Sequence, residues 1–383
     1  LPIFPREKQA TALGIWSITT LVAPICGPLL GGYISDTYYW GWIFLMNVPV
    51  GLVVGFFCSS NLSDRETATV KLRVDAIGMS LLVVWAGALQ IMLDRGKNED
   101  WFASDMIIVL AIVSLVGFLV FLVWELTEEH PIVDLSLFRY RNFALGTVVF
   151  CLGNGVFLSN MLLMSLWLPT HMAYTATWAG LVTAPTGVVA VLLTPFVVRA
   201  LARMHVRIVP TVAFLASATS YYMRASLTAD ASFEAIALPL IVQGIGSATF
   251  FIATVSIVLD GIPQDRVPSA TGLSNFARIL VSGFSVSVMT TLWDRREALH
   301  QSRLADVVSG APLPFDNALS TLQGLGASGL AAKAAVTNEM VSQAYMLASI
   351  DLFQLSMWLS LASVIVVWFC RGTKPAARLV APD

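Results

Sequence analysis

Charged side chains are scarce in this sequence: 12% of its 383 residues are Asp, Glu, Lys or Arg, whereas 57% are hydrophobic. A typical soluble domain carries roughly 25% charged residues. So few charges cannot cover the surface of a soluble protein of this length, and the composition therefore indicates an integral membrane protein. The net charge of -2 offers no basic surface, so binding to nucleic acid is not expected.

Cysteine and histidine are also rare, with four of each. Cys26, Cys58, Cys151 and Cys370 fall within or at the edge of apolar segments, and we interpret them as small hydrophobic residues. The histidines are scattered and form no metal-binding pattern. No metal, catalytic group or cofactor is expected. A membrane enzyme is disfavoured, because it would need clustered catalytic groups at the interface.

Long apolar runs dominate the rest of the chain. A membrane-spanning helix needs about 20 mostly apolar residues, and none of the runs alternates as a membrane barrel strand would. Because backbone polar groups in lipid must be satisfied within their own segment, the runs are predicted to be helices. The expected fold class is all-α and polytopic, with ten spans over residues 11–32, 42–59, 74–93, 104–124, 143–168, 178–198, 208–227, 235–259, 269–292 and 346–370.

Basic residues in the connecting segments predict the orientation. Fourteen fall on the side of the two chain ends and seven on the other, where four of the seven share one long loop. Cytoplasmic loops carry an excess of Lys and Arg, and long loops count for less. Both ends of this chain are therefore predicted to lie in the cytoplasm. The remaining basic residue, Arg278, falls inside the ninth segment.

Two connections stand out by composition. Residues 125–142 are charged and predict an amphipathic linker along the cytoplasmic membrane surface. Residues 293–345 predict a long extracytoplasmic loop. Leucine spacing indicates helical pieces on both sides of a Gly/Pro-containing break near residues 310–314. A loop of this length is usually functional or disordered.

The first apolar segment contains the stretch APICGPLLGGYISD, residues 23–36, in which prolines and glycines interrupt an apolar helix. Glycines four residues apart lie on one face and let two helix backbones approach closely in lipid, while each proline bends the helix. Plain helix packing would also explain this pattern. The residues of the motif are Pro24, Gly27, Pro28, Gly31 and Gly32.

This stretch resembles the antiporter motif of major facilitator drug exporters. WGWIFLMNVPVG (residues 40–51), LQIMLDRGKNEDWF (89–102), PIVDLSLFRYRNF (131–143) and TGLSNFARILVSGFSVSV (271–288) follow in the order that the family shows. Together they resemble the 14-helix drug:proton antiporter family, the EmrB/QacA branch, and in particular EmrB-like multidrug exporters. The resemblance extends over nearly the whole chain.

The resemblance implies a major facilitator fold in which the ten segments are helices five to fourteen of an expected fourteen. Residues 1–59 would then close the N-terminal six-helix half, 74–124 would form the extra central pair, and 143–370 would form the C-terminal half. The family's first four helices, with its best candidates for proton-coupling carboxylates, are absent from this chain. We therefore expect a chain truncated at its N-terminus that cannot transport on its own.

The function implied by the resemblance is proton-coupled efflux of hydrophobic drug-like compounds across a bacterial inner membrane, with the proton gradient as the energy source. It also implies a periplasmic adaptor and an outer-membrane channel as partners, with the loop 293–345 as the expected adaptor contact. The alternatives are a transport-inactive fragment that serves as an assembly module, and another exporter or an uptake porter of the same superfamily.

Candidate pathway residues are polar side chains inside the apolar segments. A charge near the bilayer centre costs a few kcal/mol, so such residues usually face the bundle interior and are functional. Arg278 meets this description, and Asn275 lies on the same helix face. The competing interpretation is a structural anchor that bonds neighbouring carbonyl groups.

Other candidates carry weaker signals. Asp94 and Arg95 end the third segment, where they could form an ion-pair gate or a simple pair among lipid headgroups. Gln90 lies one turn deeper and could line the cavity. Gln243 and Asn154 are amides within the membrane that must find partners in lipid, either by packing between helices or by lining the cavity.

Overall fold

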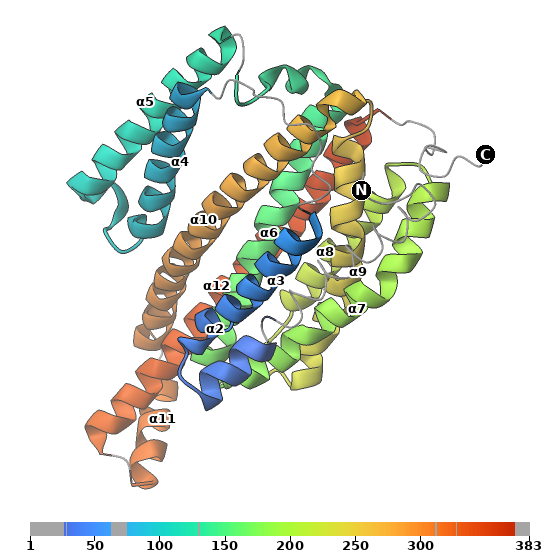
Figure 1. The fold of residues 1–383 in the computed structure, drawn as a ribbon. Helices are drawn as coiled ribbons and strands as arrows, with labels where there is room; N and C mark the ends of the chain where they lie inside the picture. Colours follow the sequence, from blue (N-terminus) through green and yellow to red (C-terminus); the bar gives the residue numbers. More distant parts are fainter. Residues whose placement is uncertain are drawn as a thin grey trace.

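The structure, a computed structural model, describes residues 27, 29–62, 75–128, 131–310, 312–326 and 328–371, and every regular element in these ranges is a helix (Figure 1). Eight of these helices are long and apolar enough to cross a membrane. The all-α, polytopic fold class is thereby confirmed. Most of the first predicted segment, 11–32, lies outside the described residues, and the seventh is a shorter helix of 17 residues.

Six helices form the main bundle. Helix α6 packs against α9, α10 and α12, while α8 packs against α9 and α12, and α7 lies along α9. Buried apolar side chains fill two large clusters, one around Trp167 and Phe353 and the other around Phe150 and Phe214. The helices are α6 (Arg141–His171), α7 (Ala176–Arg203), α8 (Ile208–Arg224), α9 (Phe233–Val258), α10 (Val267–Gly310) and α12 (Gly329–Phe369).

Hydroxyl side chains begin three of these helices. Thr175, Ser232 and Ser328 each accept a hydrogen bond from the backbone N–H three residues later, at the starts of α7, α9 and α12. Such caps satisfy donors that have no partner within the helix. They explain why the helices begin where the hydropathy profile alone gives no boundary.

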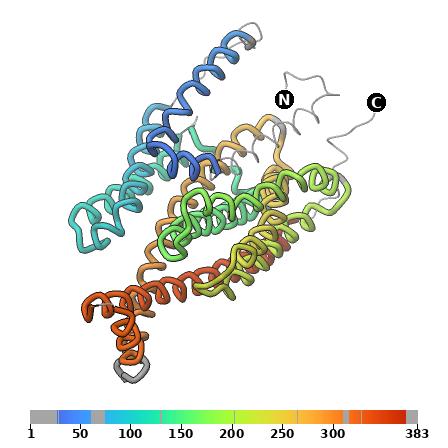
Figure 2. The backbone as a smooth tube through the Cα atoms, turned by 90° about the horizontal axis from the view of Figure 1, so that it is seen from below, coloured from blue at the N-terminus to red at the C-terminus, as the bar shows by residue number. Residues whose placement is uncertain are grey.

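A separate helix pair stands beside the bundle, formed by α4 (Ala76–Gly96) and α5 (Asp105–Thr127) with the short η3 (Trp101–Ala103) between them (Figures 1 and 2). Asp75 caps α4 by accepting from the N–H groups of Ile77 and Gly78, and its second oxygen accepts from the Trp124 indole at 2.8 Å. The pair contacts the bundle through α10, where the Trp85 ring meets Phe276 edge to face.

The predicted span 42–59 is divided at Met46 into α2 (Trp42–Leu45) and α3 (Asn47–Leu62). A further helical stretch, 29–37, precedes them. None of the apolar window of Trp42–Ser60 is buried against the rest of the described chain. These helices therefore present apolar side chains outward, as a membrane-facing segment does.

The linker 125–142 folds back onto the end of the bundle. Its short helix η4 (Leu135–Arg139) places Leu137 in the core, where its side chain is completely buried. Asp134 pairs with Arg266 of η5 (Gln264–Arg266) at 2.5 Å, and hydrogen bonding to Tyr140 raises the pKa of Arg266. The linker is therefore anchored to protein through part of its apolar face.

The stretch 293–345 is helical over most of its length rather than an open loop. Helix α10 continues to Gly310, α11 spans Pro312–Gly324, and α12 begins at Gly329. The predicted break near residues 310–314 lies at the junction of α10 and α11. The predicted span ends at residues 292 and 346 are places where the hydropathy changes, and the helices α10 and α12 continue past them. A helix can continue from the membrane into water when its side chains become polar.

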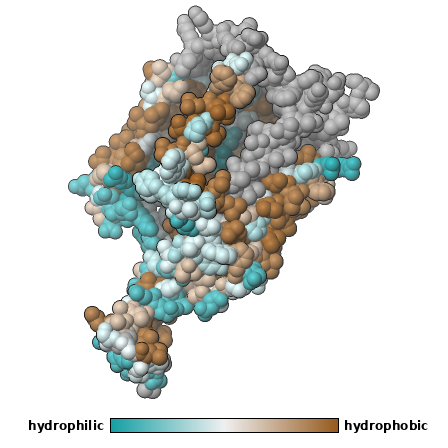
Figure 3. Space-filling view, turned by 60° about the horizontal axis from the view of Figure 1, so that its bottom comes forward, coloured by the Kyte–Doolittle hydropathy of each residue, from teal (hydrophilic) through white to brown (hydrophobic). Residues whose placement is uncertain are grey.

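Residues 293–345, the end of α10 with α11 and the start of α12, form an extension that reaches well beyond the bundle (Figure 1). A helix of 44 residues, the length of α10, is about 66 Å long at 1.5 Å per residue, roughly twice the 30 Å of a bilayer's hydrocarbon core. Helix α11 closes the end of the extension (Figure 2). In the view of Figure 3, hydrophobic side chains cover the two flanks of the molecule, and more hydrophilic ones lie between them and near the base of the extension.

Candidate functional site

Arg278 projects from the first third of α10 toward α6. Its guanidinium donates to the side-chain oxygens of Asn154 and Asn275, each at 3.3 Å. It also lies over the rings of Phe150 and Phe251, 5.3 and 5.8 Å from their centroids. Within the described residues it forms no salt bridge. Its positive charge is therefore held by amides and aromatic faces and is not neutralised by a carboxylate.

The amide of Asn154 is the centre of this network. Its side chain is 1% exposed, its oxygen accepts from Arg278, and its nitrogen donates to the Ser282 hydroxyl at 2.6 Å. Ser282 in turn donates to the backbone oxygen of Arg278. Because the hydrogen-bonding groups of the amide are used on both sides, Asn154 fixes the guanidinium relative to α6.

Helix α4 forms the opposite wall. Gln90 donates to Asp94 at 2.9 Å, along one face of the helix. Two contacts hold this face close to α10: the Ser287 hydroxyl donates to the backbone oxygen of Leu93 at 2.8 Å, and Lys97 forms a salt bridge with Asp294 at 2.8 Å. The polar side chains of α4 are thus brought alongside those of α10.

Between α4, α6 and α10 lies an open cavity of about 470 Å³. This volume is within the range of about 300–1,000 Å³ that is typical of small-molecule sites. Apolar groups from Leu158, Leu162, Ile279 and Val286 share its wall with polar ones. The polar and charged residues that line it are Gln90, Asp94, Lys97, Asn98, Asn154, Arg278, Ser282, Ser287 and Thr290.

Several of the predicted pathway residues meet at this cavity. Arg278, Asn154, Gln90 and Asp94 line it, and Asn275 is bonded to Arg278. The others lie elsewhere. Arg95 is exposed and outside the cavity wall, and no ion pair joins it to Asp94 among the described residues.

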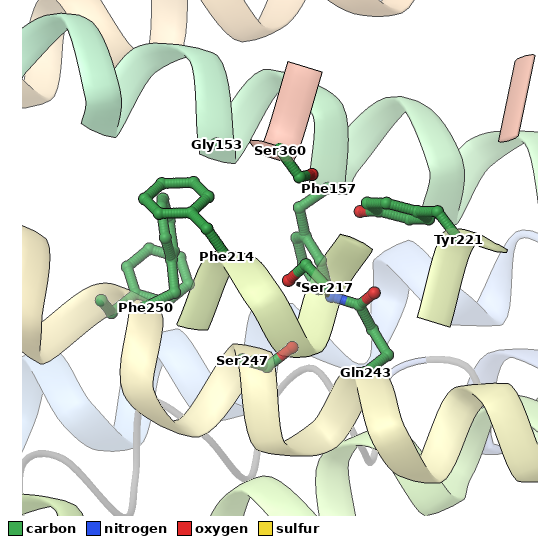
Figure 4. Close-up of a pocket in the computed structure, with 11 residues that line it drawn as sticks. Gly153, Phe157, Phe214, Ser217, Tyr221, Gln243, Ser247, Phe250 and Ser360 are labelled. Carbon is green, nitrogen blue, oxygen red and sulfur yellow. Dashed lines mark hydrogen bonds between the residues drawn. The ribbon is translucent and has the colours of Figure 1, made fainter. Parts of the chain in front are cut away.

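Gln243 lies in a different part of the bundle. It is buried and donates to the Ser217 hydroxyl at 3.2 Å, on the wall of a second, smaller pocket (Figure 4). Its surroundings are helices α6, α8, α9 and α12, whereas the larger cavity involves α4.

The sequence reasoning missed the serine and threonine side chains that extend the polar wall along α10. Ser282 follows Arg278 by four residues and therefore shares its face, and Thr290, two turns further along α10, lines the same cavity. That spacing was available in the sequence. The pairing of Lys97 with Asp294 was not, because the two residues are far apart in the chain and their contact depends on how α4 docks.

Only part of the glycine–proline motif can be located. Pro24 and Pro28 lie outside the described residues, and no described atom lies within 4 Å of where a Cβ on Gly27 or Gly31 would sit. Gly32 is different: a Cβ there would collide with the backbone oxygen of Ala176 at the start of α7. The motif therefore makes a close backbone approach to α7 at this position.

Asp36 reinforces that approach. Its carboxylate accepts from the backbone N–H of Thr177 at 2.7 Å, from the Thr177 hydroxyl at 2.6 Å and from the N–H of Ala176 at 3.3 Å. The bonds from Thr177 lower the pKa of the Asp36 carboxyl, although the residue itself is exposed. A carboxylate is well placed at a helix N-terminus, where backbone N–H groups are free and the dipole is positive.

A family model described as Major Facilitator Superfamily matches residues 2–286, three-quarters of the chain. The chain belongs to this superfamily. It is 40% identical over 369 residues to multidrug export protein EmrB of Escherichia coli K12, covering 96% of the chain and 72% of that relative. It is 39% identical over 368 residues to fatty acid resistance protein FarB of Neisseria gonorrhoeae, covering 96% and 73%. Probable multidrug resistance protein EmrY of E. coli is 37% identical over 369 residues.

The superfamily match confirms the major facilitator resemblance inferred from the motifs, and the identities of 40% and 37% to EmrB and EmrY confirm its EmrB-like character. The protein is accordingly a membrane transporter and not an enzyme. Transporters of this superfamily bind substrate near the bilayer midplane, between repeats that move against each other. A polar cavity beside α10 is therefore the feature of this structure that most merits a functional test.

Proposed function

We propose that the protein exports hydrophobic drug-like compounds across the bacterial inner membrane in exchange for protons. Two of the relatives described above carry multidrug export or multidrug resistance in their names. The observation that carries the proposal is Arg278, a charged residue that faces a cavity large enough for a small molecule and has no carboxylate partner among the described residues. Such a charge within a membrane segment is functional by default.

In this proposal the cavity supplies two kinds of contact. Apolar wall residues such as Leu158 and Ile279 take up the hydrophobic body of the substrate, and Arg278 with its amide partners orients polar groups. No covalent chemistry is needed, because transport requires only that substrate and proton bind the two facing states with different affinity. Asp94 lines the same cavity and is a candidate to take a proton as substrate leaves.

The proposed orientation follows the basic residues and places both ends of the chain in the cytoplasm. The extension of α10, α11 and α12 then lies in the periplasm. We propose that it contacts a periplasmic adaptor, which in turn joins an outer-membrane channel. The exposed side chains of Val307, Leu325 and Leu330 on this extension support the idea, since each is at least two-thirds exposed.

The test of transport is dye retention in cells that lack their own exporters and express the protein from its complete natural gene. Dye should be expelled in a manner that a protonophore abolishes, and Arg278→Ala should slow expulsion without lowering the amount of protein in the membrane. Arg203→Ala is the matched control, because Arg203 is an exposed arginine at the end of α7, outside both the cavity and the extension. Equal rates for the two variants would contradict a role for Arg278.

Adaptor contact has its own test. A photo-crosslinking amino acid placed at Leu325 or Leu330 should capture the adaptor in cells, whereas the same amino acid at Trp358, exposed on the membrane span of α12, should not. Capture from all three positions at equal yield would reflect nonspecific collision and would remove this part of the proposal.

A further inference from the structure

A second pocket is enclosed within the six-helix bundle, on the side of α6 away from the larger cavity. Its walls come from α6, α8, α9 and α12 (Figure 4). Gly153 lines this pocket and the next residue, Asn154, lines the other, so the two spaces lie on different sides of the same stretch of α6. In Figure 4 the side chains of Gln243, Ser217 and Tyr221 converge on this space from two helices.

Two polar atoms at this pocket lack protein partners. The amide nitrogen of Gln243 donates to Ser217, but its oxygen is fully hidden and accepts no hydrogen bond from the described residues. The hydroxyl of Ser247, one turn further along α9, is in the same condition. The Gln243 side chain as a whole is 3% exposed. Buried polar groups in proteins are almost always satisfied, by protein or by ordered water.

Size and charge restrict what can satisfy them. The space that a water-sized sphere can occupy is about 20 Å³. A single water needs about 10–15 Å³ by this measure, whereas a drug-like molecule needs hundreds. None of the described residues that line the pocket is charged, so an ion would be buried without compensation.

We propose that this pocket binds one ordered water molecule, which donates to the Gln243 side-chain oxygen and accepts from the Ser247 hydroxyl. Gln243 and Ser247 are one turn apart on α9. Tyr221 of α8 and Ser360 of α12 also line the pocket, and in this proposal their hydroxyl groups supply the remaining hydrogen bonds of the water. Buried waters typically make about three hydrogen bonds of this kind.

The proposal gives Gln243 a structural role. An amide that is bonded to Ser217 on one side and to a trapped water on the other ties α9 to α8 in the interior of the bundle. It neither faces the larger cavity nor has space beside it for a substrate. The sequence leaves open whether Gln243 lines the transport cavity or packs between helices. Its place in the structure favours packing between helices.

Radiolytic hydroxyl labelling of the full-length protein in nanodiscs tests this inference, because radicals formed from a trapped water oxidise the side chains around it. Tyr221 and Trp167 are each 1% exposed, but only Tyr221 lines the pocket. We expect Tyr221 to be oxidised well above Trp167, although indole is the more reactive ring. Equal, background-level oxidation of the two residues would show that the pocket is dry and would overturn the proposal.

A variant then tests the polar atoms. Gln243→Leu with Ser247→Ala keeps similar side-chain volumes, removes both polar groups and adds no readily oxidised side chain, so Tyr221 oxidation should fall to the level of Trp167. Persistent oxidation of Tyr221 in the folded variant would overturn the assigned hydrogen bonds. If the variant does not fold, the comparison of Tyr221 with Trp167 in the unaltered protein still decides whether water is present.

Discussion

The carboxylate of Asp36 accepts two hydrogen bonds from Thr177, at 2.7 and 2.6 Å, and so joins the end of the glycine–proline stretch to the first turn of α7. The two residues lie 141 positions apart in the sequence. Beside them, the backbone of Gly32 approaches that of Ala176 too closely for any side chain. The helical stretch 29–37, expected in the N-terminal half of the fold, is thus hydrogen-bonded to α7, which is expected in the C-terminal half.

This contact predicts a specific pH dependence. Because Thr177 lowers the pKa of Asp36 below its ordinary value of 3.8, the ionised carboxylate stabilises the folded state at pH values above that value. The stabilisation is lost as pH falls through the lowered pKa. Asp36→Asn should therefore reduce the melting temperature of the protein in nanodiscs at pH 7, and the difference from the unaltered protein should shrink toward pH 3.

The control for that experiment is Asp230→Asn, which removes an exposed carboxylate from the connection between α8 and α9. We expect it to leave the melting temperature unchanged over the same pH range. A loss at pH 7 as large as that of Asp36→Asn would mean that net charge, and not the contact with α7, is being measured.

A second prediction concerns the unpaired charge of Arg278. Asn154→Asp places a carboxylate where the amide oxygen now accepts from the guanidinium at 3.3 Å. The resulting ion pair should hold Arg278 in place and compete with substrate. If it stabilises the resting state by about 1.4 kcal/mol, efflux slows about tenfold. Dye efflux and melting temperature, measured on the same preparation, should show slower transport with no loss of stability.

Asn154→Ala separates charge from hydrogen bonding in that experiment. It removes the same amide but adds no carboxylate, and it should destabilise the protein by about 1–3 kcal/mol because Ser282 and Arg278 lose a buried partner. Faster efflux in Asn154→Asp than in Asn154→Ala, at matched amounts of protein, would argue against competition between the new carboxylate and substrate.

The docking of α4 on α10 gives a third prediction. Lys97 and Asp294 form a salt bridge of 2.8 Å with side chains 42% and 34% exposed. Exposed pairs contribute about 0.2–1 kcal/mol. Lys97→Glu and Asp294→Lys should each reduce stability, while the double variant should recover most of the loss. Melting temperatures of all four proteins form the double-mutant cycle, and purely additive losses would mean that the pair does not interact in the membrane.

Much of the fold was predictable because the bilayer imposes its own rule. Helices must satisfy their backbone groups internally, so long apolar runs predict spans such as α5 and α9 closely. Helix ends outside the membrane follow other causes. Hydropathy falls after residue 292, but α10 continues to Gly310, because its polar side chains suit a helix in water.

The candidate site likewise combines residues that the sequence identifies with contacts that it does not. Arg278 was identifiable as a charge inside an apolar run, and Asn275 by its spacing on the same face. The partnership with Asn154 depends on how α6 packs against α10, which no local pattern encodes. Arg224 was not singled out from the sequence, because it lies near the end of the predicted span 208–227. The structure buries it against the rings of Tyr221 and Phe353, contacts that depend on how α8 packs on α12.

Close helix packing yields the last prediction. A Cβ added to Gly244 would lie 2.6 Å from the backbone oxygen of Thr186 on α7, so neither backbone can move aside without separating α7 from α9. Gly244→Ala should therefore destabilise the bundle by about 1–3 kcal/mol, as overpacked cores do.

Gly272→Ala makes the same change near the start of α10, where no described atom lies within 4 Å of the added Cβ. Because alanine favours helix over glycine by about 1 kcal/mol, that variant should be neutral or more stable. Thermal unfolding in nanodiscs distinguishes the two, and equal losses would mean that helix packing at Gly244 is looser than the described contact requires.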